Sequence, residues 1–151
     1  MKKILIINDG IPGHFNQSKG VALMISETYE CSISTHELSW RLHFLRSACN
    51  VFGKLLLRLN NKNIARGILW MYAPIDIQGH DLVIAAGGNT MQVSAAIKLA
   101  YSLPVIQLGS PRGLHSSAFN ALVTVEKYFD HPSNIVAAIT PNIYSPAICS
   151  I

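Results

Sequence analysis

A loop that carries a carboxylate and a histidine follows the first apolar run of the chain. Residues 4–7 are Ile-Leu-Ile-Ile, and after Asn8 the sequence places Asp9 and His14 five positions apart. Histidine exchanges a proton near neutral pH and suits the role of a general base. A nearby carboxylate can orient the imidazole or act as the base itself. We therefore predict proton transfer in this loop, with His14 and Asp9 as the candidate catalytic residues.

Glycines and amides surround this pair. Gly10 and Gly13 allow a tight turn and the close approach of a ligand, but their spacing does not fit the G-x-G-x-x-G fingerprint of dinucleotide-binding proteins. A helix predicted to begin at Asn16 would point its free N–H groups at the loop, which favours an anion. Asn16 and Gln17 are further ligand-binding candidates. The alternative interpretation is a structural turn in which Asp9 or Asn16 caps the helix.

Two further glycine loops follow apolar segments. The backbone amides of residues 87–90, Gly-Gly-Asn-Thr, can bind a phosphate or sugar hydroxyls, unless Asn89 or Thr90 only caps the next helix. In the loop 109–113, Arg112 can bind a carboxylate or phosphate, or remain a solvated surface arginine. The ligand-binding candidates of these two loops are Gly87, Gly88, Asn89, Thr90, Ser110 and Arg112.

The other histidines and the cysteines show no metal-binding pattern. Apart from His14, the histidines are scattered without ligand spacing, so we predict no metal site and no cofactor. The three cysteines, Cys31, Cys49 and Cys149, form neither a metal motif nor a plausible disulfide framework. Reduced thiols that serve as packing residues in a cytosolic protein are the simplest explanation.

The hydrophobic pattern predicts a scaffold that brings the three loops together. Short aliphatic runs predict strands at residues 4–8, 29–36, 81–86, 104–108, 120–125 and 134–139. Helices are predicted at residues 16–27, 38–60, 64–72 and 91–101. This alternation is typical of a Rossmann-like three-layer α/β/α domain with a mostly parallel sheet. Because the carboxyl ends of parallel strands share one edge, we expect the three glycine loops to converge there.

The length and composition of the chain suit one domain. It has 151 residues, of which 50% are hydrophobic and 13% charged, so apolar surface can remain for a partner or a membrane. We expect a single domain over residues 1–146, with residues 147–151 as a tail or the start of a linker. The first apolar run is too short for a signal peptide, and no run approaches the roughly 20 residues of a membrane span. This pattern favours a cytoplasmic location, with peripheral membrane attachment as an addition.

Positive charge is concentrated in the middle of the chain. The formal net charge is +4, six of the twelve basic residues lie between Arg41 and Arg66, and no acid lies between Glu37 and Asp76. One interpretation is docking on an anionic membrane; the other is a core-covering helix with an ordinary solvated face. The aromatic residues lie within an apolar stripe, which argues against nucleic acid. The lipid-contacting residues would be Arg41, Arg46, Lys54 and Arg58, with Trp40, Phe44 and Phe52 near the interface.

The glycine loops also resemble those of a known family. The opening residues look like the signature of the mitochondrial fission ELM-type family, whose bacterial members are related in fold to GT-B glycosyltransferases. The matching residues are Asp9-Gly10, Pro12-Gly13-His14, Asn16-Gln17 and Gly20, then residues 81–87 with Thr90, residues 105–108 with Pro111-Arg112, and residues 119–125. The chain departs at Gly88-Asn89, where the family usually carries basic residues, and at residues 126–131, where it carries a segment of the proline-acid-histidine-aspartate kind.

The resemblance covers only part of such proteins and implies a partner. Similar proteins have two Rossmann-like domains with a cleft between them, and this chain resembles the N-terminal half of a GT-B fold. In GT-B enzymes that half usually binds the acceptor and often supplies the base, whereas the second half binds the nucleotide sugar. The chain would then be a natural short form, a truncated gene or one half of a split enzyme. Alone, it is expected to be inactive.

Three functions follow from these observations. The first is an acceptor-side glycosyltransferase-like domain that acts on a carbohydrate or lipid-linked acceptor, with His14 as base and a second Rossmann-like domain or a homo-oligomer as partner. The second is a non-catalytic interaction or scaffold protein, which the association of the family with mitochondrial fission makes reasonable. The third is a stand-alone binder of a nucleotide or a small anion.

Overall fold

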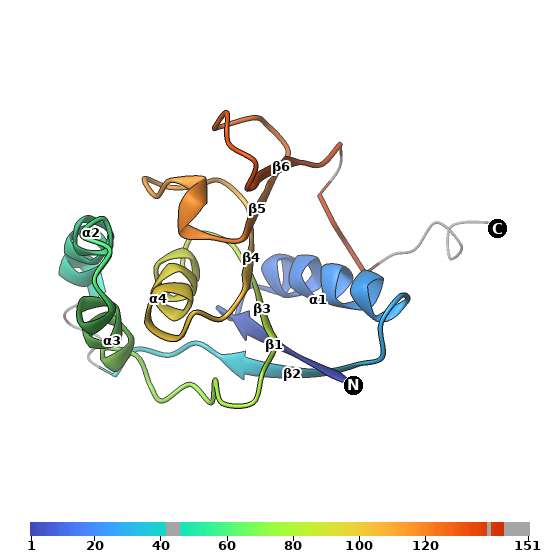
Figure 1. Ribbon diagram of the computed structural model, residues 1–151, viewed down its shortest axis with the longest axis horizontal. Helices are drawn as coiled ribbons and strands as arrows, with labels where there is room; N and C mark the ends of the chain where they lie inside the picture. Colours follow the sequence, from blue (N-terminus) through green and yellow to red (C-terminus); the bar gives the residue numbers. More distant parts are fainter. Residues whose placement is uncertain (42–45, 139, 144–151) are drawn as a thin grey trace.

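The computed structural model describes residues 1–41, 46–138 and 140–143, and within them six strands form one parallel sheet (Figure 1). The strand order is β2-β1-β3-β4-β5-β6, and every neighbouring pair is parallel. The elements are β1 (Lys2–Asn8), α1 (Pro12–Ser26), β2 (Cys31–Glu37), α2 (Arg46–Leu57), α3 (Lys62–Trp70), β3 (Leu82–Ala86), α4 (Met91–Tyr101), β4 (Val105–Leu108), the 3-10 helix η2 (Ser116–Ala118), β5 (Ala121–Thr124) and β6 (Asn134–Val136).

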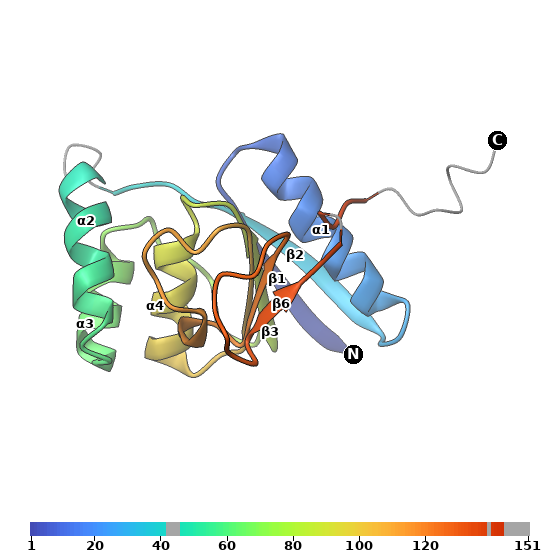
Figure 2. The ribbon, with the colours of Figure 1, turned by 90° about the horizontal axis from the view of Figure 1, so that it is seen from above.

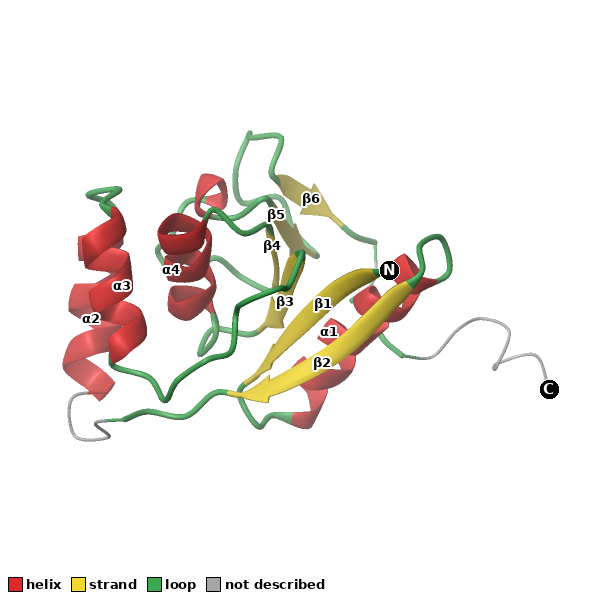
Figure 3. Cartoon of the chain, turned by 60° about the horizontal axis from the view of Figure 1, so that its bottom comes forward, coloured by secondary structure: helices red, strands yellow, loops and turns green. Residues whose placement is uncertain are grey.

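The direction of the strand order reverses between β1 and β3. From β1 the chain crosses through α1 to the neighbour β2 on one side, and from β3 it crosses through α4 to β4 on the other. The two helices lie on opposite faces of the sheet (Figure 1), and β1 and β2 lie over α1 (Figure 3). In open α/β sheets such a reversal leaves a crevice outside the carboxyl ends of the two strands, where ligands bind.

Successive residues of β1 point to opposite faces of the sheet and build two apolar clusters. Ile4 and Ile6 pack with Ala22 of α1, whereas Leu5 and Ile7 pack with residues of α3 and α4. Helix α2 lies on the side of α4 that faces away from the sheet, and it contacts both α3 and α4 (Figure 2). The predicted Rossmann-like three-layer α/β/α architecture is therefore confirmed. No helix of the described residues is long and apolar enough to span a membrane.

The helix predicted at residues 38–60 is wrong over its first part. Leu38 extends the sheet, because its N–H donates to the Asn8 carbonyl at 2.7 Å. Trp40 forms an antiparallel bridge with Tyr72, and their ring centroids lie 4.3 Å apart, which packs Trp40 against the core instead of at an interface with lipid. Residues 42–45, and with them Phe44, lie outside the described residues. Tertiary pairing thus overrides a local spacing that is typical of a helix.

Helix α1 begins four residues earlier than the sequence predicts, at Pro12 instead of Asn16. Proline is favoured at a first helical position, because its missing N–H would have no partner there. Asn16 therefore lies inside the helix and does not cap it. At the other end of the chain, β6 closes at Val136, and the expected domain boundary at residue 146 lies outside the described residues.

Candidate functional site

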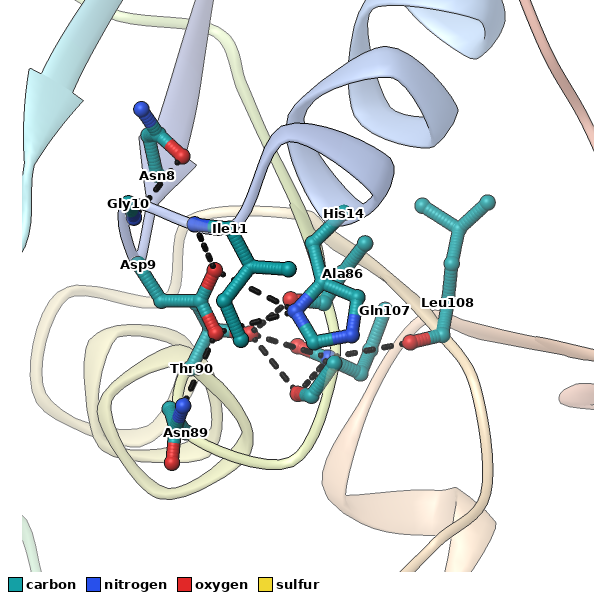
Figure 4. Close-up of polar contacts among 11 residues, drawn as sticks. Asn8, Asp9, Gly10, Ile11, His14, Ala86, Asn89, Thr90, Gln107 and Leu108 are labelled. Atoms are coloured by element: carbon teal, nitrogen blue, oxygen red, sulfur yellow. Dashed lines mark hydrogen bonds and ion pairs between the residues drawn. The ribbon is translucent and has the colours of Figure 1, made fainter.

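The three predicted glycine loops meet at the carboxyl edge of the sheet (Figure 4). The side chain of Asn89, after β3, donates to the Asp9 carboxylate, after β1, at 3.0 Å. The N–H of Gly87 donates to the carbonyl of Leu108, at the end of β4, at 3.0 Å. Residues from three separate parts of the chain thus surround the β1/β3 reversal, as the parallel arrangement predicts.

Asp9 is the buried centre of this site, since its side chain is only 2% exposed. One carboxylate oxygen accepts the N–H of Ile11 at 3.2 Å, and the other accepts the amide of Asn89 and lies 2.9 Å from Nδ1 of His14. Gly10 makes the turn possible with a φ of +82°, a conformation that favours glycine. Both oxygens of Asp9 accept hydrogen bonds, a geometry that suits Asp9 to orient the imidazole of His14.

His14 carries the group that can exchange a proton. Its Nδ1–H donates to Asp9, its side chain is 29% exposed, and among the described residues Nε2 has no hydrogen-bond partner. The imidazole lies directly against the backbone of Gly87, where a Cβ atom would overlap the ring. Gly87 also has a φ of +86°. The glycine therefore serves two purposes, the turn after β3 and the space for the imidazole.

Neither helix that begins at the site has a side-chain cap. Ile11 precedes α1 and Thr90 precedes α4, and neither accepts a capping hydrogen bond with its side chain. Asn89 donates to Asp9, and the Thr90 hydroxyl donates to the carbonyls of Ala86 and Gly87. The polar loop residues therefore do not cap these helices with their side chains, although Thr90 occupies the N-cap position of α4. The positive ends of α1 and α4 both lie near the β1/β3 reversal without a side-chain acceptor.

The third glycine loop, residues 109–113, contributes Arg112 to the site, but its Ser110 lines a separate cavity. Arg112 has a φ of +42°, and its guanidinium lies against Gly88, where a Cβ atom would overlap it. Ser110 and Gln17 instead line a neighbouring cavity of about 180 Å³ at the ends of β4 and β5. The sequence thus predicted a single site, whereas the structure separates the Asp9–His14 pair with Asn89 and Arg112 from the cavity beside Ser110. Gly13 and Asn16 lie in the first turns of α1, and Asn16 makes no side-chain hydrogen bond within the described part of the chain.

Gln107 in β4 was not predicted as a site residue. Its side chain connects the loop that follows β3 to the end of β4 through hydrogen bonds. Its side chain is fully buried, and its Nε2 donates to the Gly87 carbonyl at 3.1 Å, to the Thr90 hydroxyl at 3.1 Å and to the Leu108 carbonyl at 3.3 Å. A buried polar side chain is usually retained for such hydrogen bonds. The only sequence signal was a glutamine inside an otherwise aliphatic strand.

Replacing Gln107 with methionine should lower the free energy of unfolding by about 1–3 kcal/mol, because buried acceptors would lose their donor. Urea denaturation measures the change. Gln78→Met is the control, since Gln78 is exposed in a loop. Equal effects of the two substitutions would show that Gln107 does not brace the loops.

A metal site is not apparent in the described residues 1–41, 46–138 and 140–143, where no group of three His, Cys, Asp or Glu side chains is close enough to bind an ion. Comparisons of the chain with protein-family models, curated proteins and solved structures found no match. The function is therefore proposed from the residues and the geometry of the site.

Proposed function

We propose that the chain is the acceptor-side half of a glycosyltransferase-like enzyme, in which His14 removes the proton of an acceptor hydroxyl. The observation that carries the proposal is the 2.9 Å contact between Nδ1 of His14 and the buried Asp9 carboxylate, which leaves Nε2 available at the β1/β3 crevice. The resemblance of the opening residues to a GT-B-like family supplies the reaction class. The geometry of the Asp9–His14 pair supports His14 as the base.

The proposed step transfers a sugar and a proton together. The acceptor oxygen attacks the anomeric carbon of a nucleotide sugar and forms the new C–O bond. The bond from that carbon to the phosphate oxygen breaks, and the nucleoside diphosphate leaves with the electron pair. The acceptor proton passes to Nε2 of His14, while Asp9 stabilises the resulting imidazolium.

Positive features beside the pair suit a phosphate-bearing reactant. The uncapped amino ends of α1 and α4 lie near the β1/β3 reversal, and such ends attract anions. The family that the chain resembles carries basic residues after the glycine, whereas here Arg112 brings a guanidinium from another loop to Gly88. A planar guanidinium binds phosphate through two parallel hydrogen bonds.

Exposed apolar side chains next to the site form a surface that a second domain could cover. Val125 and Tyr128 line the cavity beside Ser110 and are exposed, as are Ile135 and Val136 of the edge strand β6. Parallel sheets are normally covered, so exposed apolar residues at their edge favour a covering partner. A second Rossmann-like domain, on another chain or on a second copy, would cover this surface and exclude water from the crevice.

The test is the activity of the chain in its natural assembly. The tagged chain is purified from its own cells with whatever binds to it, and nucleotide release is measured from UDP-glucose, UDP-N-acetylglucosamine and GDP-mannose with sugar and lipid-linked acceptors. We expect a second Rossmann-like protein to copurify in equal amount and release to depend on it. If the purified material releases no nucleotide from any of these donors, the proposal is wrong.

We also propose that α2 docks this domain on an anionic membrane, where a lipid-linked acceptor would be found. Phe52 and Leu55 of α2 are 62% and 58% exposed, Lys54 lies between them in the sequence, and Arg58 directly follows the helix. Residues 38–75 contain no acid, so nothing in that segment repels anionic lipid. Arg41 lies over the exposed Trp70 ring at 5.2 Å. The side chain of Arg46 is outside the described part of the chain.

Leu55→Ser should weaken binding to vesicles of phosphatidylserine and phosphatidylcholine roughly tenfold, because one apolar anchor is lost. Vesicle sedimentation at low salt measures the binding. Leu23→Ser is the matched control, since Leu23 is 41% exposed but lies on α1, on the other face of the sheet. Equal binding to vesicles with and without phosphatidylserine would contradict docking on an anionic surface.

A further inference from the structure

A second cavity, of about 610 Å³, lies on the α4 face of the sheet. It is bordered by the end of α2, the start of α3, the second half of α4 and the segment around η2. Helix α4 separates this cavity from the Asp9–His14 pair, because its first turn follows the Gly87–Thr90 loop whereas Lys98 and Ser102, near its other end, line the cavity. The cavity is therefore distinct from the proposed catalytic site.

Three cations line this cavity, and none of them pairs with a carboxylate of the residues that the structure describes. Arg58 donates to the carbonyl of Gly113 at 3.1 Å, and the Lys98 ammonium donates to the carbonyls of Ser117 and Phe119 at 2.8 and 2.9 Å. No Asp or Glu is among the lining residues. Arg58 and Lys98 therefore keep free donor hydrogens as well as their charge.

Lys62 is the third of these cations, and its side chain has no hydrogen-bond or ion-pair partner among the described residues. It is the first residue of α3, and its side chain is exposed and makes no hydrogen bond or ion pair within the described residues. Its ammonium is free to turn toward a ligand that enters the cavity. A third positive charge also favours a ligand with more than one negative charge.

Lys98 is partly buried and donates only to carbonyl oxygens among the described residues. Partial burial lowers the pKa of Lys98, because its ammonium loses hydration and no nearby negative charge compensates the loss. Carbonyl oxygens accept two of its three hydrogens but do not neutralise its charge. A negative group in the cavity would do so, and Arg58 and Lys62 line the same cavity.

The rest of the cavity wall is largely apolar. Leu57, Leu99 and Leu114 come from three different segments and face the cavity together. A volume of about 610 Å³ is in the range of sites that bind small organic molecules. The combination of an apolar wall with clustered cations calls for a ligand that has an apolar body and a strongly anionic group.

We propose that this cavity binds an organic phosphate, with the phosphate group at Arg58, Lys62 and Lys98 and the apolar part against the leucine wall. A phosphate monoester brings about −1.5 to −2 charges and several acceptor oxygens, which matches three cations with spare donors. The phosphate group can belong to a soluble metabolite or to the headgroup of a lipid.

The test uses two probes that represent these sources. Phenyl phosphate stands for a soluble phosphate ester, and dihexanoyl phosphatidic acid, kept monomeric, stands for a lipid. Each is titrated at low salt into the ¹⁵N-labelled full chain, and the amide resonances of Gly113, His115 and Ser117 are followed. We expect a saturable shift of these resonances with at least one probe.

Two variants decide whether the shift reports the proposed cations. Lys62→Gln should weaken binding about tenfold or more, the effect of losing one charged hydrogen bond, and this exposed side chain has no structural partner to lose. Lys19→Gln on α1 removes the same charge from the other face of the sheet and should leave binding unchanged. Binding of phenyl phosphate identifies a soluble ligand, and binding of the lipid alone identifies a headgroup. No saturable shift with either probe, or equal losses in both variants, overturns the proposal.

Discussion

Replacing His14 with glutamine is expected to lower nucleotide release by the assembled enzyme by about 10²–10⁴-fold, the usual contribution of a positioned general base. Glutamine keeps a polar side chain near Asp9 but cannot take a proton, so the transfer step is lost while the loop remains. The free energy of unfolding should change little, because the glutamine amide can still donate to the buried Asp9 carboxylate and Nε2 of His14 has no partner among the described residues. The measurement is the initial rate of release from the active donor.

A second histidine provides the control for this substitution. His80 lies just before β3, at the opposite edge of the sheet, where its Nε2 is 2.8 Å from the hydroxyl of Ser34. His80→Gln should leave the rate of nucleotide release unchanged. If the two variants lose the same activity, or if His14→Gln loses none, His14 is not the base.

Gly87→Ala should destabilise the chain by about 2–5 kcal/mol and displace the imidazole of His14. The left-handed backbone contributes about 1–2 kcal/mol for a residue with a Cβ atom, and crowding in a packed site adds about 1–3 kcal/mol. At Gly87 both apply, since φ is +86° and the new methyl group would overlap the His14 ring. Urea denaturation gives the stability, and the imidazole resonances of His14 report its position.

Gly113→Ala separates the two contributions. Gly113 has a φ of +90°, but a Cβ atom there would have no heavy atom within 4 Å. Its replacement should therefore show the backbone contribution alone and leave the His14 resonances unchanged. Equal destabilisation by the two substitutions would mean that His14 does not rest on Gly87.

The sequence predicted the sheet well because buried parallel strands leave a strong local pattern. Residues 4–7 and 82–86 are continuous aliphatic runs, and both form central strands. The convergence of Asp9, His14 and Asn89 followed from parallel topology alone, since that arrangement places every strand end on one edge. No contact had to be known in advance.

The sequence was a poorer guide wherever distant contacts decide the outcome. The apolar spacing from Leu38 onward predicted a helix, but pairing of Trp40 with Tyr72 keeps that segment extended. Periodicity also identifies an apolar face without showing what covers it, and so left open whether Phe52 packs on the core or is exposed, as it is in the structure. The bracing role of Gln107 depends on three acceptors from other loops, which no local pattern encodes.

The hydrogen bond from Asn89 to Asp9 has a consequence for how the protein folds. It joins residues 80 positions apart, and it can form only after β1 and β3 have paired in register. Contacts of such long sequence separation are slow to form, because a large loop must close first. A partly folded chain would leave the Asp9 carboxylate hydrated and the imidazole free to rotate. The proposed proton-transfer site therefore depends on the pairing of β1 with β3, and only the native chain holds the imidazole of His14 in a fixed orientation.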